Sequence, residues 1–96
     1  MRVIEETNQF NRDLRRKAQG PHRETLQTDF VAILAALAND QPLPDRHRDH
    51  ALTGDWKNHR ECHVRPNLLL IYKKQGITEG GFLFLIRLGS HSELFG

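Results

Sequence analysis

Two short apolar runs near the C-terminal end constrain the fold of this chain most strongly. Leu68–Tyr72 is one continuous run, Phe82–Leu88 is the other, and turn-forming residues lie between Gly76 and Gly81. Such runs are typical of strands covered on both faces, and the short connection between them predicts a hairpin. Because side chains alternate along a strand, we expect two opposite sets in the second run: Phe82, Phe84 and Ile86 against Leu83, Leu85 and Arg87.

The N-terminal half predicts a strand and two helices ahead of this hairpin. Residues 2–6 alternate weakly, as in a short strand. From Thr7 or Asn8, either of which can cap a helix, an apolar residue recurs every fourth position until Gly20–Pro21 ends the pattern. A second helix ends near Asn39 and has its apolar residues at helical spacing, namely Leu26, Phe30, Ile33, Leu34 and Leu37.

Between the helices and the hairpin, residues 40–57 show no sustained period and predict a long ordered loop. Arg60–Arg65 then alternates as a strand, and Pro66 fits a turn after it. We expect the side chains of this strand to alternate, with Cys62 and Val64 on one face and Glu61, His63 and Arg65 on the other. The order predicts one α+β domain over residues 1–96, with two N-terminal helices packed on a mainly antiparallel sheet of about four strands.

Composition narrows the class of protein further. A chain of 96 residues has the size of one domain, and no apolar run approaches the ~20 residues that span a bilayer. The N-terminus lacks the pattern of a secretion signal, and the one cysteine excludes an internal disulfide. We therefore expect a cytoplasmic domain that makes no membrane contact.

Arginine and histidine point to a phosphate-containing partner. Ten of the 14 cationic residues are arginine, whose planar donor fork suits phosphate. Four of the six histidines lie between positions 47 and 63. Imidazoles beside a guanidinium suit phosphodiester cleavage, because one takes the proton of a ribose 2′-hydroxyl and another protonates the departing 5′-oxygen.

Other uses of these side chains fit the sequence less well. Three histidines can bind zinc, but no H-E-x-x-H arrangement is present, so we expect no metal site. His22, His47 and His59 are expected to be surface or hydrogen-bonded side chains. Cys62 is expected to be a small buried apolar residue rather than a nucleophile.

Several segments of the second half resemble a known family. They are residues 49–57 (Asp-His-Ala-Leu-Thr-Gly-Asp-Trp-Lys), 60–64 (Arg-Glu-Cys-His-Val), 70–73 (Leu-Ile-Tyr-Lys) and 87–96 (Arg-Leu-Gly-Ser-His-Ser-Glu-Leu-Phe-Gly). Together they are similar to the YafQ-type toxins of the RelE/ParE superfamily. This resemblance implies a RelE-like toxin of a type II toxin–antitoxin pair that cuts messenger RNA in the ribosomal A site. It implies that cleavage needs neither a metal nor another cofactor. It also implies a cognate antitoxin that neutralises the toxin.

The resemblance also implies the site residues. His91 would be the general acid, with His50 or His63 as the base or its orienter, and Arg87 would bind the scissile phosphate. Further substrate contacts would come from Phe95, which would stack on a base, and from Asn67, Arg65 and Lys57. Position 67 departs from the family, which often has an acidic residue there. Since an amide cannot act as a general base, we expect a histidine to take that role.

The partners implied by this interpretation are ribosomal and messenger RNA and the antitoxin. Arginines expected to contact ribosomal RNA are Arg12, Arg15, Arg16, Arg46 and Arg48. One alternative is a ParE-like toxin that binds gyrase without catalysis, and another is a regulatory module that binds a metal through its histidines. The set of His50, His63 and His91 beside Arg87 favours the nuclease, because a pure binding protein does not need it.

Overall fold

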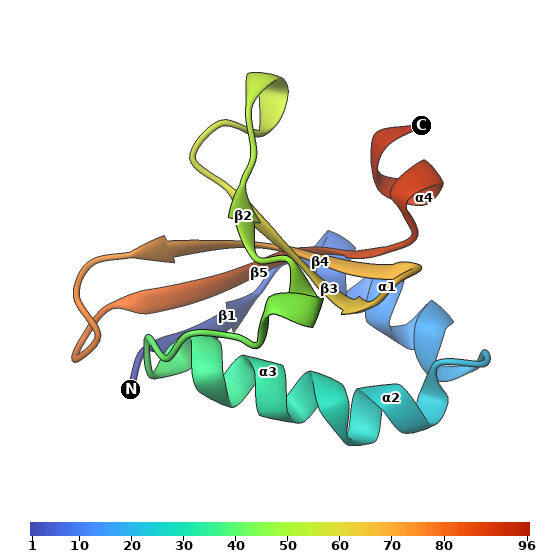
Figure 1. The fold of residues 1–96 in the computed structure, drawn as a ribbon, viewed down its shortest axis with the longest axis horizontal. Coiled ribbons are helices and arrows are strands. Elements are labelled where there is room, and N and C mark those ends of the chain that lie inside the picture. Colours follow the sequence, from blue (N-terminus) through green and yellow to red (C-terminus); the bar gives the residue numbers. More distant parts are fainter.

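A five-stranded sheet with helices on both faces forms the protein, described by a computed structural model of residues 1–96 (Figure 1). Its strand order is β1-β5-β4-β3-β2, and neighbours are antiparallel except for β1 and β5, which run parallel. The strands are β1 (Val3–Glu6), β2 (His50–Ala51), β3 (Arg60–Arg65), β4 (Leu68–Gln75) and β5 (Phe82–Gly89). The predicted α+β class is confirmed, with five strands in place of about four.

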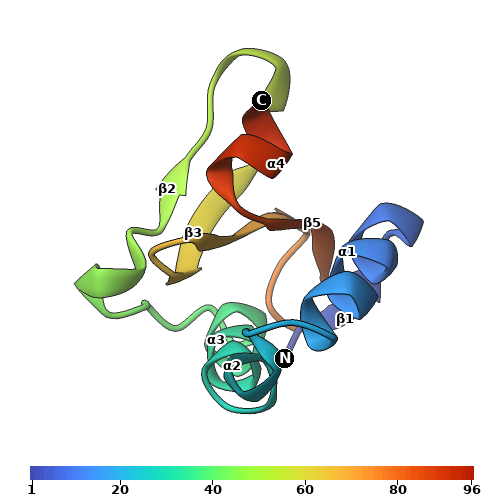
Figure 2. The same cartoon turned by 90° about the vertical axis from the view of Figure 1, so that its right-hand side faces the viewer.

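Helices lie on both faces of the sheet. They are α1 (Asn8–Ala18), α2 (Arg23–Gln27), α3 (Asp29–Ala38) and α4 (His91–Phe95), with the short 3-10 helices η1 (Asp45–His47) and η2 (Gly54–Trp56). Figure 2 shows α2 and α3 below the sheet and α4 with the β2 segment above it. None of the helices is long and apolar enough to cross a membrane.

Two apolar clusters hold these layers together. The larger one joins α1 and α3 to the sheet through side chains such as Phe10, Phe30 and Leu85. The smaller one lies on the opposite face, where Leu69 and Ile71 pack against Leu94 of α4. Burial of these side chains at about 25 cal/mol per Å² stabilises the fold and fixes α4 on the second face.

The predicted first helix is confirmed, whereas the predicted second helix is two helices. The hydroxyl of Thr7 caps α1 by accepting a hydrogen bond from the Phe10 amide at 3.0 Å. At Thr28 the backbone leaves the helical region, with φ −122° and ψ −84°. The Thr28 hydroxyl donates to the carbonyl of Glu24 at 3.0 Å, and this local bond accompanies the break between α2 and α3.

Bulges change two of the predicted strand faces. The register of β4 and β5 shifts so that Tyr72 faces Leu85 and Ile71 faces Arg87, which leaves Ile86 as an extra residue. The prediction that Arg87 lies on the face of Leu83 and Leu85 was therefore wrong, because one inserted residue turns the following side chain over.

The second bulge lies in β3, where the register shifts between His63 and Arg65. Arg65 turns toward the helices, and its guanidinium forms an ion pair with Asp29 of α3 at 2.7 Å. The prediction that Arg65 shares a face with His63 was wrong for the same reason as in β5.

The predicted ordered loop over residues 40–57 is confirmed, and it contains η1, β2 and η2. His47 anchors it, because this buried ring bonds through Nδ1 to the carbonyl oxygen of His63 at 2.7 Å. The loop then pairs with β3 through His50 opposite Glu61. These contacts place histidines of the loop and of β3 side by side.

Candidate active site

A cleft of about 280 Å³ separates the β2–η2 segment from α4 on the second face of the sheet. Seven residues line it: His50, Leu52, Thr53, Trp56, Glu61, His91 and Phe95. The predicted residues His50, His91 and Phe95 thus come together, although they lie far apart in the sequence. The cleft combines imidazole groups with aromatic walls.

The backbone of the loop orients His50. Arg48 adopts a left-handed conformation with φ 45°, which is uncommon for a residue with a side chain. Its carbonyl oxygen lies 2.6 Å from Nδ1 of His50. Since a carbonyl can only accept, Nδ1 carries a proton, and Nε2 is the atom of the neutral ring with a free electron pair.

A buried carboxylate connects the two histidines of this region. Glu61 is only 4% exposed, and its Oε1 lies 3.3 Å from Nε2 of His63 and 3.7 Å from Nε2 of His50. The two rings are 6.5 Å apart between centroids. Sequence reasoning placed Glu61 on the face of His63 and assigned it no role, because only the pairing of β2 with β3 puts it opposite His50.

Helix α4 holds His91 at its first position. Ser90 caps the helix, and its hydroxyl and backbone amide exchange hydrogen bonds with Glu93 in a capping box. Lys17 of α1 forms an ion pair with Glu93 at 2.7 Å. The hydrogen bond from Lys17, followed by that from the Ser90 amide, lowers the pKa of Glu93 to about 2. These bonds tie α4, and with it His91, to the body of the protein.

Aromatic side chains form the wall beside His91. The ring of Phe95 lies 4.9 Å from the His91 ring, and Trp56 packs edge-on against Phe95 at 6.3 Å between centroids. Aromatic faces of this kind can stack on an unpaired base. Phe95 is half-buried, so it contributes to packing and still reaches the cleft.

Arg87 lies on the same face of the sheet but outside the lining of the cleft. Its Nε and Nη2 donate to the carboxylate of Asp13 at 2.8 and 3.3 Å. Burial alone would raise the pKa of Asp13, but the hydrogen bonds from Arg87 and from the Leu88 amide outweigh it and lower that pKa. The bond to Asp13 raises the pKa of Arg87, which stays cationic.

Three predicted substrate contacts lie elsewhere. Arg65 pairs with Asp29 beside the helices, and Asn67 is exposed in the turn between β3 and β4. Lys57 is exposed at the end of η2, where its carbonyl is bound by Nδ1 of His59 at 3.1 Å. None of the three lines the cleft that contains His50 and His91.

Cys62 and possible metal ligands are the remaining candidate reactive groups. Cys62 is fully buried, and burial raises its pKa to about 12, so it is a packing residue as predicted. No group of three or more histidine, cysteine, aspartate or glutamate side chains is arranged to hold a metal ion.

Comparisons with known proteins all point to the same family. The family model described as "Bacterial toxin of type II toxin-antitoxin system, YafQ" matches residues 2–96. The mRNA interferase toxin YafQ of Escherichia coli K12 is 37% identical over 95 residues, covering 99% of this chain and 97% of that toxin. The putative toxin YafQ of Haemophilus influenzae is 36% identical over 87 residues, covering 91% and 85%.

The fold agrees with that of a YafQ toxin of known structure. A chain in the crystal structure of the E. coli DinJ–YafQ complex superposes with a TM-score of 0.80 and 34% identity. The match covers 100% of both chains, so the similarity includes the β2–η2 segment and α4 as well as the sheet.

Proposed function

This chain belongs to the YafQ family of toxins from bacterial type II toxin–antitoxin systems and is an mRNA endoribonuclease, and we propose that it cleaves messages in the ribosomal A site by acid–base catalysis with its own side chains. The observation that carries the proposal is the position of His50 and His91 in one cleft. Two imidazoles on facing segments can serve the attacking and the departing oxygen of one phosphodiester.

His50 is the base in this mechanism. Its Nδ1 donates to the Arg48 carbonyl, so Nε2 is free to take the proton of the ribose 2′-hydroxyl. This assignment supplies the base that Asn67 cannot provide, and it follows the expectation that a histidine takes that role.

Glu61 and His63 support the base without contacting the reacting atoms. When His50 takes up a proton, the Glu61 carboxylate at 3.7 Å stabilises the positive charge. His63, whose Nε2 lies 3.3 Å from the same oxygen, forms an ion pair with the carboxylate when its ring is protonated and helps to hold it in place. Glu61 and His63 are therefore positioning residues, and of the two alternatives for the base we choose His50.

His91 is the acid. The 2′-oxygen attacks phosphorus, the bond from phosphorus to the 5′-oxygen breaks, and His91 gives its proton to that oxygen. The products are a 2′,3′-cyclic phosphate and a 5′-hydroxyl end. Each proton transfer accounts for about 10²–10⁴-fold in rate. Phe95, in contact with His91, stacks on a base beside the scissile bond.

Arg87 stabilises the charge of the phosphorane from the side. Asp13 occupies its Nε and Nη2, while Nη1 makes no hydrogen bond within the protein and is free to donate to a phosphate oxygen. Arg65, Asn67 and Lys57 lie outside the cleft and, unlike Arg87, are not on the strand face that carries Glu61 and His63. We therefore assign them no part in bond cleavage and keep them as candidate contacts to the more distant message.

A cognate antitoxin is the protein partner that we propose. The support is the complex of E. coli YafQ with DinJ, a protein assembled with a homologue of this chain. Membership of the YafQ family also favours the nuclease over the gyrase-binding alternative.

Message-programmed ribosomes test the mechanism. We expect cuts at A-site codons, 5′-hydroxyl ends that accept phosphate from a polynucleotide kinase, and no effect of a chelator that removes zinc and copper but leaves ribosomal magnesium. Equal cleavage of free message would contradict ribosome dependence. Loss of cleavage with the chelator would contradict catalysis by side chains alone.

A further inference from the structure

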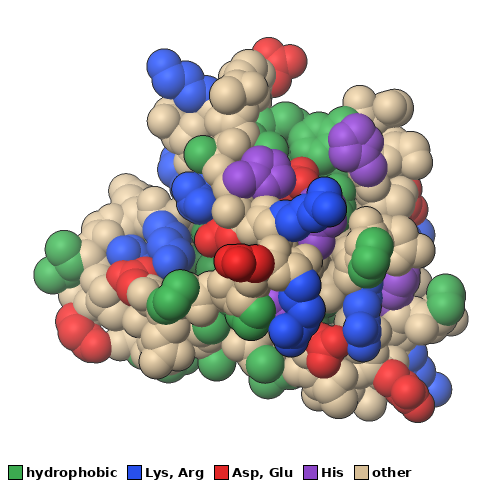
Figure 3. All heavy atoms as spheres, viewed as in Figure 1, with side chains coloured by type: hydrophobic (Ala, Val, Ile, Leu, Met, Phe, Trp, Pro, Cys, Tyr) green, Lys and Arg blue, Asp and Glu red, His purple; other side chains and the backbone are tan.

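A second cleft adjoins the proposed active site through His63. It encloses about 370 Å³ and is lined by Arg46, Arg48, His63 and Pro66, without a carboxylate. The ring of His63 contacts Glu61 of the first site and also reaches this second cleft. Figure 3 shows arginine or lysine side chains beside histidines near the centre of the side of the molecule that faces the viewer. We refer to the second cleft as the arginine cleft.

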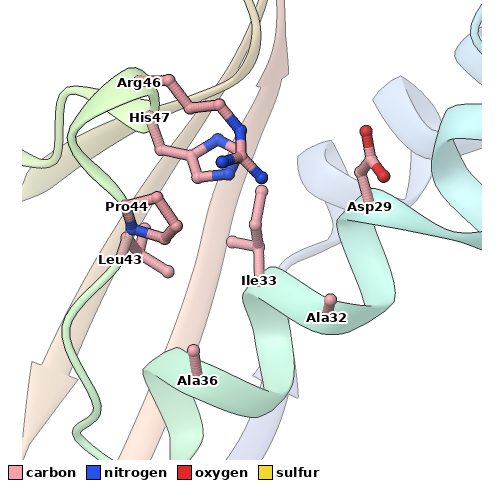
Figure 4. Close-up of a pocket in the computed structure, with 8 residues that line it drawn as sticks. All are labelled: Asp29, Ala32, Ile33, Ala36, Leu43, Pro44, Arg46 and His47. Atoms are coloured by element: carbon pink, nitrogen blue, oxygen red, sulfur yellow. The ribbon is translucent and has the colours of Figure 1, made fainter.

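The fold fixes the two arginines through the residue between them. His47 is 6% exposed, and its Nδ1 bonds to the carbonyl oxygen of His63 at 2.7 Å. Because His47 points inward, its neighbours Arg46 and Arg48 emerge on the outer surface beside the His63 side chain. Figure 4 shows Arg46 and His47 together on this segment, facing Asp29 and Ile33 of α3.

The guanidinium groups of Arg46 and Arg48 are free. Neither makes an ion pair or a side-chain hydrogen bond, and both residues are exposed. Asp29, which lines the adjoining pocket with Arg46, is held by Arg65 at 2.7 Å. Asp49, the neighbour of Arg48, accepts hydrogen bonds from Tyr72 and Arg60 at 2.5 and 3.3 Å.

Several other arginines of the fold have carboxylate partners, such as Arg2 with Asp40 and Arg87 with Asp13. Two unpaired guanidiniums in one cleft form a site for an anion with several acceptor oxygens, which is the chemistry of a phosphate. A single RNA strand carries one phosphate per nucleotide, so a strand whose scissile phosphate lies between His50 and His91 has further phosphates along its path.

We propose that the arginine cleft is a phosphate subsite for the messenger strand, in which Arg46 and Arg48 bind a phosphate neighbouring the scissile one. This inference rests on the proposed function of the first cleft. It assigns the two arginines to the substrate, whereas the sequence suggested ribosomal RNA as their partner. Arg48 would act at both sites, since its carbonyl orients His50 while its guanidinium binds the strand.

Binding to a short RNA that cannot be cut tests the subsite. The probe is a fluorescent single-stranded RNA with a 2′-O-methyl group at the scissile nucleotide, and the readout is the Kd by anisotropy over a range of salt. We expect Arg46→Gln and Arg48→Gly each to weaken binding about tenfold at low salt and to lower the salt slope by about one. Glycine suits the left-handed backbone at position 48, so Arg48→Gly removes the guanidinium and keeps the turn.

The matched control is Arg23→Gln, which removes an exposed and unpaired arginine from α2. We expect it to change Kd less than about twofold. The phosphate is then located with RNAs that each carry one neutral methylphosphonate. One position beside the scissile phosphate should weaken wild-type binding, and the double variant Arg46→Gln/Arg48→Gly should be insensitive there.

Three results would overturn the subsite: both variants binding like Arg23→Gln, equal sensitivity of wild type and double variant at every methylphosphonate, or no wild-type binding at low salt. Thermal melts of the variants check that the fold is intact. If wild type cleaves messages on the ribosome while any of these results holds, only the subsite fails. Failure of wild type to cleave any message would overturn the proposed function itself.

Discussion

The carboxylate of Asp13 in α1 binds Arg87 of β5 through both of its oxygens, across 74 positions of the sequence. The Asp13 side chain is fully buried and also accepts from the Leu88 amide at 3.0 Å. One residue therefore joins the first helix to the strand that leads into α4, and it holds the cation proposed to face the phosphorane.

Asp13→Asn tests this connection. The amide keeps the shape but loses the charge and half of the acceptor capacity, which leaves Arg87 and the Leu88 amide poorly satisfied. We expect the free energy of unfolding in urea to fall by about 2 kcal/mol. Arg16→Gln is the control, because Arg16 binds the same carboxylate from the surface, where it is 58% exposed, and should cost less than about 1 kcal/mol. Equal losses in both variants would contradict the central role of the Arg87 pair.

The free energy of unfolding at acid pH should depend on the ionisation of Glu93. Its pKa falls from 4.5 to about 2 on folding, so the ionised form stabilises the protein fully above pH ~4.5, and this contribution is lost as the pH falls toward 2. In Glu93→Gln the free energy of unfolding should be lower than in wild type at pH 5, and the gap should close by pH 2. Unfolding curves between these limits measure the gap. A constant difference over the range would show that Glu93 titrates normally in the folded protein.

Elements with many residues were predictable from the sequence, and very short ones were not. The residues of α1, β3, β4 and β5 repeat a helical or strand period often enough to be read directly. The two residues of β2 and the five of α4 are too few to show a period, and α4 depends on its capping box and on Leu94 packing against the sheet. The site is built on these two elements, so the roles of its histidines and of Phe95 came from the family resemblance, whereas Leu52, Thr53 and Trp56 were not predicted as wall residues.

Face assignments failed where the strands bulge. Alternation predicts faces only while each residue has one partner, and the extra residue at Ile86 brings Arg87 to the face of His63. Glu61 was missed for a related reason. Its importance lies in facing His50 across the pairing of β2 with β3, and no local pattern encodes that contact.

His91→Ala should remove the general acid without disturbing the fold. His91 is exposed at the first position of α4, so we expect the unfolding free energy to stay within about 0.5 kcal/mol of wild type. Cleavage on programmed ribosomes should fall at least ~100-fold, because the 5′-oxygen leaves without a proton donor. Growth arrest equal to wild type after expression of the variant would remove His91 from the mechanism.

Asn67→Asp introduces the acidic side chain that the family resemblance implies for this position. Asn67 is exposed in the turn after β3 and outside the cleft, so we expect the variant to fold normally and to cleave at a rate equal to or above that of wild type. Asn67→Ala serves as the neutral comparison in the same ribosome assay. A severe loss of rate in Asn67→Asp alone would mean that this turn approaches the reacting phosphate in the bound state.

Glu61→Gln separates the charge of the buried carboxylate from its shape. Glutamine fills the same space opposite His50, but it cannot stabilise the positive ring that forms when His50 takes up the 2′-hydroxyl proton. We expect kcat to fall about 10–100-fold with KM little changed, because the interaction matters only once the proton has moved. Glu24→Gln, an exposed substitution on α2, should leave both constants unchanged. A variant Glu61→Gln with wild-type kcat would show that the carboxylate only packs between the histidines, and His63 would then have no path by which to influence the base.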